Sequence, residues 1–194
     1  MQSGFMQRLR RGLLLALLGA ALPATAASEG AVGDESQREK GSAAGNSEAS
    51  LGSAEQERYL AELQRLYPRQ SSRKALLEHC NRLLESYALR AGYRVGEKQP
   101  DDLLYQLSVA RSGVLNVREE TRSADGSRVA VRNQPVELFG VDPFVNYECP
   151  NRGHSCQVLN PQDGTPLLTL VRDHTGVAEL AKAMTFLIRD LQKG

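Results

Sequence analysis

The chain of 194 residues lacks the short motifs by which many enzymes are recognised. It has no G-x-S-x-G nucleophile elbow, no H-E-x-x-H zinc motif, no G-x-x-x-x-G-K-[ST] phosphate loop and no G-x-G-x-x-G dinucleotide fingerprint. Only three histidines are present, and neither His79 nor His174 forms a sequence pattern with a nucleophile. The sequence therefore favours a non-catalytic protein over an enzyme, and no cofactor is expected.

An excess of charge of one sign is also missing. The chain carries 24 Lys and Arg against 23 Asp and Glu, and no run of basic residues stands out. Proteins that bind nucleic acids present a clustered basic surface. We therefore expect no nucleic-acid partner.

Long hydrophobic runs are absent as well, apart from one short run near the N-terminus. Three arginines precede the apolar run 12–22, and the small-x-small pattern "ATA" follows it. This order is typical of a secretory signal peptide, which we place at 1–26 with cleavage after Ala26 or Ala27. An uncleaved anchor is the alternative, but the run is shorter than the about 20 residues that span a bilayer. We expect a periplasmic or secreted bacterial protein with no transmembrane segment after removal of the signal.

Large apolar residues are scarce in residues 27–53, which are rich in Gly, Ser, Ala and Glu. Such a segment buries too little apolar surface to offset the entropy of ordering, so it is predicted to be a disordered linker. Residues 54–194 have the length of one domain.

Helical patterns open and close this domain. A capping box formed by Ser53 and Gln56 predicts a first helix that ends at Pro68. The segment 71–92 has the strongest helical periodicity, with Ser72 as N-cap and Gly92 as the stop. A third helix is predicted over 100–113, with acids in its first turn. The last helix carries an apolar stripe from Val177 to Leu191, with Thr175 as its N-cap.

Strand patterns lie between these helices. Asp125-Gly126 predicts a hairpin, and short extended pieces are expected at 135–140 and 144–149. A second hairpin joins 155–160 to 166–173, and the nearly continuous apolar run of "PLLTLVR" predicts a central strand covered on both faces. We therefore expect an α+β fold: N-terminal helices, then a small antiparallel sheet, then a C-terminal amphipathic helix.

The three cysteines suit an oxidising compartment, in which disulfides persist. Cys149 and Cys156 flank a turn-rich loop and are predicted to form a disulfide. A metal site would add His154 to the two thiols but has no evident fourth ligand, and a redox centre would need a C-x-x-C pair. Cys80 falls on a leucine-rich helix face and is expected to be a buried free thiol; its pairing with another cysteine is the alternative.

The best candidates for a contact surface are Phe139, Phe144 and Tyr147, joined by His154 at the tip of the cysteine loop. Aromatic residues on a rigid loop act as interface anchors, although the same rings would also serve to close the core. We expect an exported, non-catalytic protein that contacts other envelope proteins as an accessory component of an assembly. A periplasmic small-ligand binding module and a cysteine- or metal-dependent periplasmic enzyme are the alternatives.

Overall fold

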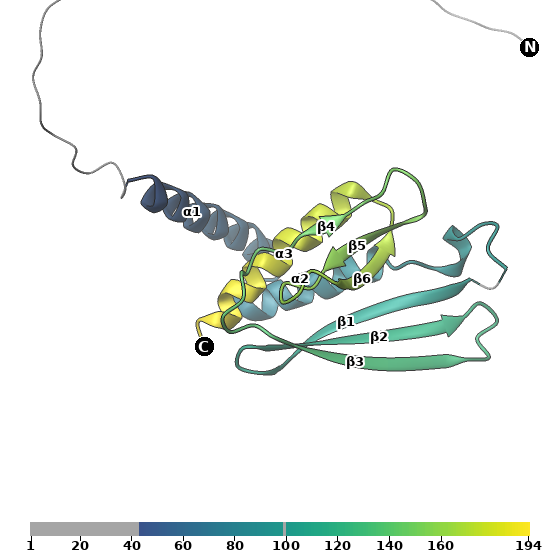
Figure 1. The fold of residues 1–194 in the computed structure, drawn as a ribbon. Helices are drawn as coiled ribbons and strands as arrows, with labels where there is room; N and C mark the ends of the chain where they lie inside the picture. The colour runs from purple at the N-terminus through teal and green to yellow at the C-terminus, as the bar shows by residue number, and fades with distance from the viewer. Residues whose placement is uncertain (1–42, 99) are drawn as a thin grey trace, which may run out of the picture. The chain divides into compact units, whose positions relative to one another are not determined.

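The computed structural model describes residues 43–98 and 100–194 (Figure 1). The predicted signal peptide at 1–26 lies outside these residues, and so does the predicted linker as far as residue 42. The rest of that linker, residues 43–53, belongs to a helix in the structure.

The described residues form an α+β fold, as the sequence predicted. The elements follow one another as α1 (Ala43–Leu66), α2 (Ser72–Ser86), the short 3-10 helix η1 (Ala91–Tyr93), β1 (Asp101–Arg111), β2 (Val114–Ser123), β3 (Val129–Glu137), β4 (Tyr147–Glu148), β5 (Ser155–Leu159), β6 (Pro166–Val171) and α3 (His174–Gln192). The strands form two antiparallel sheets, ordered β1-β2-β3 and β4-β5-β6. No helix among the described residues is long and apolar enough to cross a membrane.

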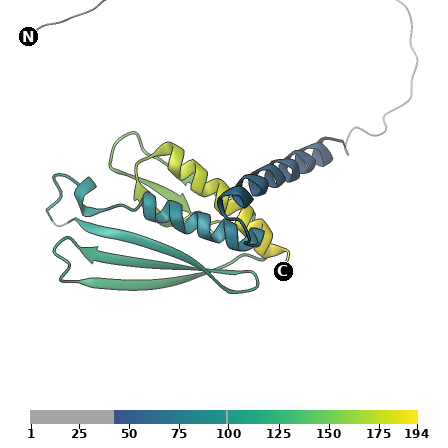
Figure 2. The same ribbon diagram turned by 180° about the vertical axis from the view of Figure 1, so that it is seen from behind.

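The core lies between the strands and the helices α2 and α3. Figures 1 and 2, seen from opposite sides, place these two helices next to each other on one side of the strands. The apolar stripe predicted for the last helix is buried, and leucines dominate the interior. The completely or almost completely buried side chains include Leu76, Leu84, Leu107, Leu115, Leu138, Leu168, Leu170, Leu180, Met184, Leu187, Ile188 and Leu191.

A two-residue segment after α2 connects the two sheets. Ala88 forms an isolated antiparallel bridge with Leu170 of β6, and the next residue, Leu89, forms one with Leu103 of β1.

The order of the strands makes β5 the central strand of its sheet. The prediction that "PLLTLVR" is the central strand was therefore wrong, because β6 borders this short segment instead of a full strand.

The side chain of Asn81 on α2 covers the edge of β1 further along. Its Nδ2 donates to the carbonyl of Leu107 at 3.0 Å, and its Oδ1 accepts from the amide of Leu107 at 2.7 Å. This amide side chain replaces one residue of a neighbouring strand, since it satisfies both a donor and an acceptor of the backbone.

The predicted third helix is wrong, because residues 101–111 form the strand β1. Tyr105, Leu107 and Val109 alternate along the chain and pack toward the core. Asp102 is one of the two acids that the prediction placed in the first turn of a helix. In the structure its carboxylate accepts a hydrogen bond from the amide of Ala91 at 2.7 Å. Gly113 has a φ of 69° in the tight turn to β2, a conformation that glycine adopts without strain.

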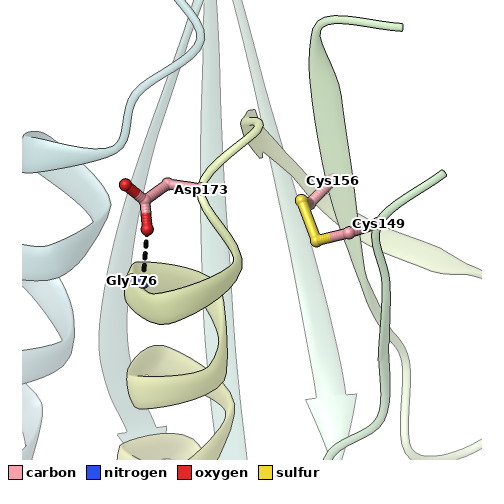
Figure 3. Close-up of a disulfide and its surroundings, with 4 residues drawn as sticks. All are labelled: Cys149, Cys156, Asp173 and Gly176. Carbon is pink, nitrogen blue, oxygen red and sulfur yellow. Dashed lines mark hydrogen bonds between the residues drawn. A yellow bond between two sulfur atoms is a disulfide. The ribbon is translucent and has the colours of Figure 1, made fainter. Parts of the chain in front are cut away.

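Four helix boundaries differ from the sequence prediction. α1 begins at Ala43, before the capping box at Ser53. α2 is capped by Ser71 and not Ser72, and it ends at Ser86, before Gly92. The N-cap of α3 is Asp173 and not Thr175, since the Asp173 carboxylate accepts from the amide of Gly176 at 2.7 Å (Figure 3).

Both predicted hairpins are present. β2 and β3 pair on either side of Asp125-Gly126, and β5 and β6 pair on either side of residues 161–165. In the first turn Asp125 accepts hydrogen bonds from Ser123 and Ser127, which lower the pKa of its carboxyl to about 2.

Candidate functional site

A partly open groove of about 280 Å³ lies between α3, the middle of α1 and the segment that leads into β4. We call it the aromatic groove. Its lining consists of Gly52 and Glu55 from α1, Phe144, Val145 and Tyr147 from the segment before and within β4, and Ala178, Ala181, Lys182, Thr185, Phe186 and Arg189 from α3. The α3 residues recur every three or four positions, so they share one face of the helix.

The segment between β3 and β4 is irregular in backbone but is fixed along α3. Near one end of it, Gln192 donates from its side-chain nitrogen to the carbonyls of Leu138 and Val141, at 2.7 and 2.9 Å. Further along, the amide of Val145 donates to the Thr185 hydroxyl at 3.1 Å. These bonds hold the outer wall of the groove at a fixed distance from the helix.

The Thr185 hydroxyl is buried, and it both accepts and donates a hydrogen bond. It accepts from Val145 and donates to the carbonyl of Ala181 at 2.9 Å. The side chain of Val145 turns inward into the core. The residue before it, Phe144, therefore points outward, because neighbouring side chains of an extended chain face opposite sides.

The disulfide begins two residues after Tyr147 in the sequence. Cys149 and Cys156 are bonded, with Cα atoms 4.3 Å apart (Figure 3), which confirms the predicted pair. β4 has only two residues, and Tyr147 pairs there with Val158. The crosslink thus ties the end of this very short strand to β5.

The walls of the aromatic groove are exposed while its floor is buried. The exposed fraction is 58% for Phe144 and 38% for Tyr147. Ala181 and Phe186 on the floor are almost completely buried. Large exposed aromatic rings above an apolar floor are typical of surfaces that bind a partner.

The charges at the rim are mostly positive. Lys182 pairs with Glu55, with Nζ and Oε1 2.9 Å apart. The hydrogen bond from Lys182 holds the pKa of Glu55 below its ordinary value, and the charges of Arg189 and Arg58 add to this effect. The guanidinium of Arg189 lies 5.9 Å from the ring centroid of Phe186. It forms no ion pair with the side chains that the structure describes.

The structure brings together two of the four predicted contact residues. Phe144 and Tyr147 line the aromatic groove, whereas Phe139 and His154 do not. Phe139 has the same exposed fraction as Phe144, 58%, but its ring covers Gly113 at the turn between β1 and β2. His154 is exposed in the cysteine loop.

Sequence reasoning missed the α3 side of the groove. Lys182, Phe186 and Arg189 lie beside the buried stripe of that helix, on the face that leads from the core to the groove. The signal that could have indicated this face is Phe186, an aromatic residue outside the stripe expected for a single packed face.

A polar cluster outside the aromatic groove joins α1, α2 and α3. The Tyr59 hydroxyl on α1 donates to Glu179 on α3 at 2.7 Å, and Glu179 lies 3.4 Å from Nε2 of His79 on α2. Nδ1 of His79 is 3.4 Å from the Tyr67 hydroxyl. The hydrogen bond with His79 is the main cause that lowers the pKa of Glu179, and burial is the main cause that raises the pKa of Tyr59.

This cluster links α1, α2 and α3 through side-chain hydrogen bonds. The neighbouring Cys80 is a buried free cysteine, as predicted, and burial raises the pKa of its thiol. A buried thiol with a raised pKa is unreactive, because the thiolate is the nucleophile. In residues 43–98 and 100–194, no group of three or more His, Cys, Asp or Glu side chains is placed to hold a metal ion.

A further hollow of about 310 Å³ lies between α2 and β1. Asn81, Leu84, Glu85, Arg90, Leu104, Tyr105 and Gln106 line it. It lies between the helical layer and the sheet, the place where a small-ligand site would be expected.

Comparisons of the chain with models of protein families, with curated protein sequences and with solved structures find no match.

Proposed function

We propose that this protein is exported, has no catalytic activity, and binds another protein through the aromatic groove as an accessory component of a bacterial envelope assembly. The observation that carries the proposal is the exposure of Phe144 and Tyr147 on a backbone that α3 and the disulfide hold in place. Rigid exposed aromatic side chains contribute much of the binding energy at protein interfaces, since little conformational entropy is lost when they are covered.

The groove is large enough to take part of a protein partner. Small-molecule sites are clefts of about 300–1,000 Å³ that enclose most of the ligand. The aromatic groove has a volume of about 280 Å³ and is open on one side. A space of this size suits one or two side chains inserted from the surface of another protein.

The export part of the proposal is supported by the signal-like N-terminus and by the disulfide between Cys149 and Cys156. Disulfides are typical of the periplasm and of secreted proteins. N-terminal sequencing of the protein purified from its own cells tests this part. A mature chain that starts directly after Ala26 or Ala27 supports export, and an intact leader on a reduced cytosolic protein would contradict it.

Site-specific photo-crosslinking in intact cells tests the binding surface. A photoreactive phenylalanine analogue replaces Phe144 in one variant and Phe139 in another, since both rings are equally exposed but only Phe144 lines the groove. We expect one discrete crosslinked protein for position 144 and none for position 139. Adding Tyr147→Ala should remove that product without a change in melting temperature. Equal crosslinking from both positions would overturn the proposal.

A small-ligand module is the second candidate, because the hollow between α2 and β1 is about 310 Å³, at the lower end of the range for such sites. Its walls combine the apolar Leu84 and Tyr105 with the charged Glu85 and Arg90. A small molecule that copurifies with the wild-type protein, and is lost when Leu104→Phe narrows the hollow, would favour this candidate.

A further inference from the structure

We infer that the aromatic groove recognises an acidic segment of its protein partner, one that inserts a large apolar side chain between Phe144 and Phe186 and sets a carboxylate against Arg189. This inference rests on the proposed function and adds the chemistry of the partner.

The first observation is the balance of charges at the rim. The carboxylate of Glu55 has three cationic neighbours, Lys182, Arg189 and Arg58, each of which favours its ionised form. Among the residues that line the groove, only Glu55, Lys182 and Arg189 are charged, and Lys182 is paired with Glu55, which leaves the positive charge of Arg189. Complementary charge at an interface selects the partner and speeds association.

The second observation is the position of Arg189 relative to the apolar floor. Its guanidinium lies over the edge of the groove, 5.9 Å from the centroid of Phe186. α1 crosses close to it at Gly52, where an added Cβ would be 3.5 Å from a guanidinium nitrogen. Because residue 52 is a glycine, no side chain of α1 separates the helix backbone from the guanidinium at that point. The Glu55 carboxylate is paired with Lys182.

The third observation is the chemistry of the floor. Ala181 and Phe186 are apolar, and the one hydroxyl there, that of Thr185, is already bonded as donor and acceptor. The floor therefore gives no polar group to a ligand and suits a hydrocarbon or aromatic side chain. A guanidinium beside such a floor binds a carboxylate in a partly water-excluded place, where charge-assisted hydrogen bonds are strong.

Three defined probes test the inference on the full mature chain by NMR titration. The probes are the peptide EDLFDE, its basic counterpart KRLFRK, and the acidic peptide EDGGDE, which has no apolar anchor. We expect saturable shifts for EDLFDE at the amides of Phe144, Tyr147 and Arg189, and weak unsaturated shifts for the other two. Affinity for EDLFDE should fall as salt rises, since exposed charges are screened over about 10 Å at 0.1 M salt.

A pair of charge reversals supplies the matched control. Arg189→Glu should weaken the binding of EDLFDE about tenfold or more, because it replaces an attractive contact by a repulsive one. Arg128→Glu changes the net charge equally but lies in the turn between β2 and β3, so it should leave affinity within about twofold. Equal losses in both variants would overturn the inference.

The outcomes also separate this inference from the proposed function. If EDLFDE produces no saturable shifts, or KRLFRK binds equally well, the acidic partner is wrong. Crosslinking from position 144 would then still support a protein-binding groove. Saturable binding of decanoate at the same amides with no binding of EDLFDE would likewise overturn the inference, because the groove would then suit a fatty acid.

Discussion

Gly176 in the first turn of α3 offers a sharp test of the packing between that helix and the end of α2. An added Cβ at this position would lie 2.1 Å from Cζ of Tyr87 and 2.4 Å from its two Cε atoms. No carbon atoms approach so closely without displacement. The substitution Gly176→Ala therefore requires either the Tyr87 ring or the helix to move.

Two opposing effects determine the size of the change. Alanine is favoured over glycine within a helix by about 0.5–1 kcal/mol. Insertion of an extra carbon into a well-packed site costs about 1–3 kcal/mol. We expect a net loss of about 1–2 kcal/mol in the free energy of unfolding for Gly176→Ala, with a melting temperature lower by about 5 °C.

Urea denaturation followed by circular dichroism measures this loss. The same substitution made in a Tyr87→Ala protein tests whether the Tyr87 ring is its cause. In a Tyr87→Ala protein the obstacle is gone, so Gly176→Ala should now stabilise by up to about 1 kcal/mol. Gly92→Ala is the control, because nothing lies within 4 Å of its added Cβ, and it should change stability by no more than about 0.5 kcal/mol. If the single substitution Gly176→Ala raises the urea midpoint of the wild-type protein, the reasoning is refuted.

Three further predictions concern the disulfide, the edge of β1 and the helix cluster. Replacing Cys149 and Cys156 by serine opens a loop of eight residues, which should cost about 2.5 kcal/mol in urea denaturation; dithiothreitol should cause a similar loss in the wild type and none in the variant. Asn81→Ala leaves the amide and carbonyl of Leu107 without their partner and should cost about 2 kcal/mol by the same assay; an unchanged midpoint would contradict the role of Asn81. Because the folded pKa of Glu179 is lowered, its carboxylate stabilises the fold above about pH 4.3, the ordinary value, and this contribution disappears as the pH falls through the lowered value. Glu179→Gln should therefore flatten the pH dependence of the unfolding free energy between about pH 5 and 3, by no more than about 1 kcal/mol for such a half-exposed group.

The parts of the fold that the sequence predicted are those in which local signals agree. The stripe on α3 and the Asp-Gly turn each need only neighbouring residues, and both are present. The disulfide was also predictable, since Cys149 and Cys156 lie only seven positions apart.

β1 could not be predicted in the same way because its local signals conflict. Pro100 and two acids resemble a helix start, while Tyr105, Leu107 and Val109 alternate as in a strand. The conflict is decided by distant partners. Leu107 pairs with Val117 of β2 on one side and with the side chain of Asn81 on the other. Tertiary pairing overrides local preference in such a segment.

The candidate site was predictable on one side only. Phe144 and Tyr147 stood out because aromatic residues are few and these two lie in an irregular segment. Lys182 and Arg189 join them from a helix about forty residues later in the chain, and helical periodicity alone gives no reason to select them. The exposure of Phe144 and Tyr147 also shows that they do not close the core.

The pair of residues that joins the two sheets has a consequence for cooperativity. The amide of Leu103 bonds to the carbonyl of Leu89 at 2.8 Å, and the amide of Val171 bonds to the carbonyl of Tyr87 at 2.9 Å. Unfolding of residues 87–89 would break both hydrogen bonds at once. Each sheet would then lose its backbone bond to the segment that they share. The six strands should therefore unfold as a single unit, and a substitution that loosens residues 87–89 would weaken both halves of the molecule together.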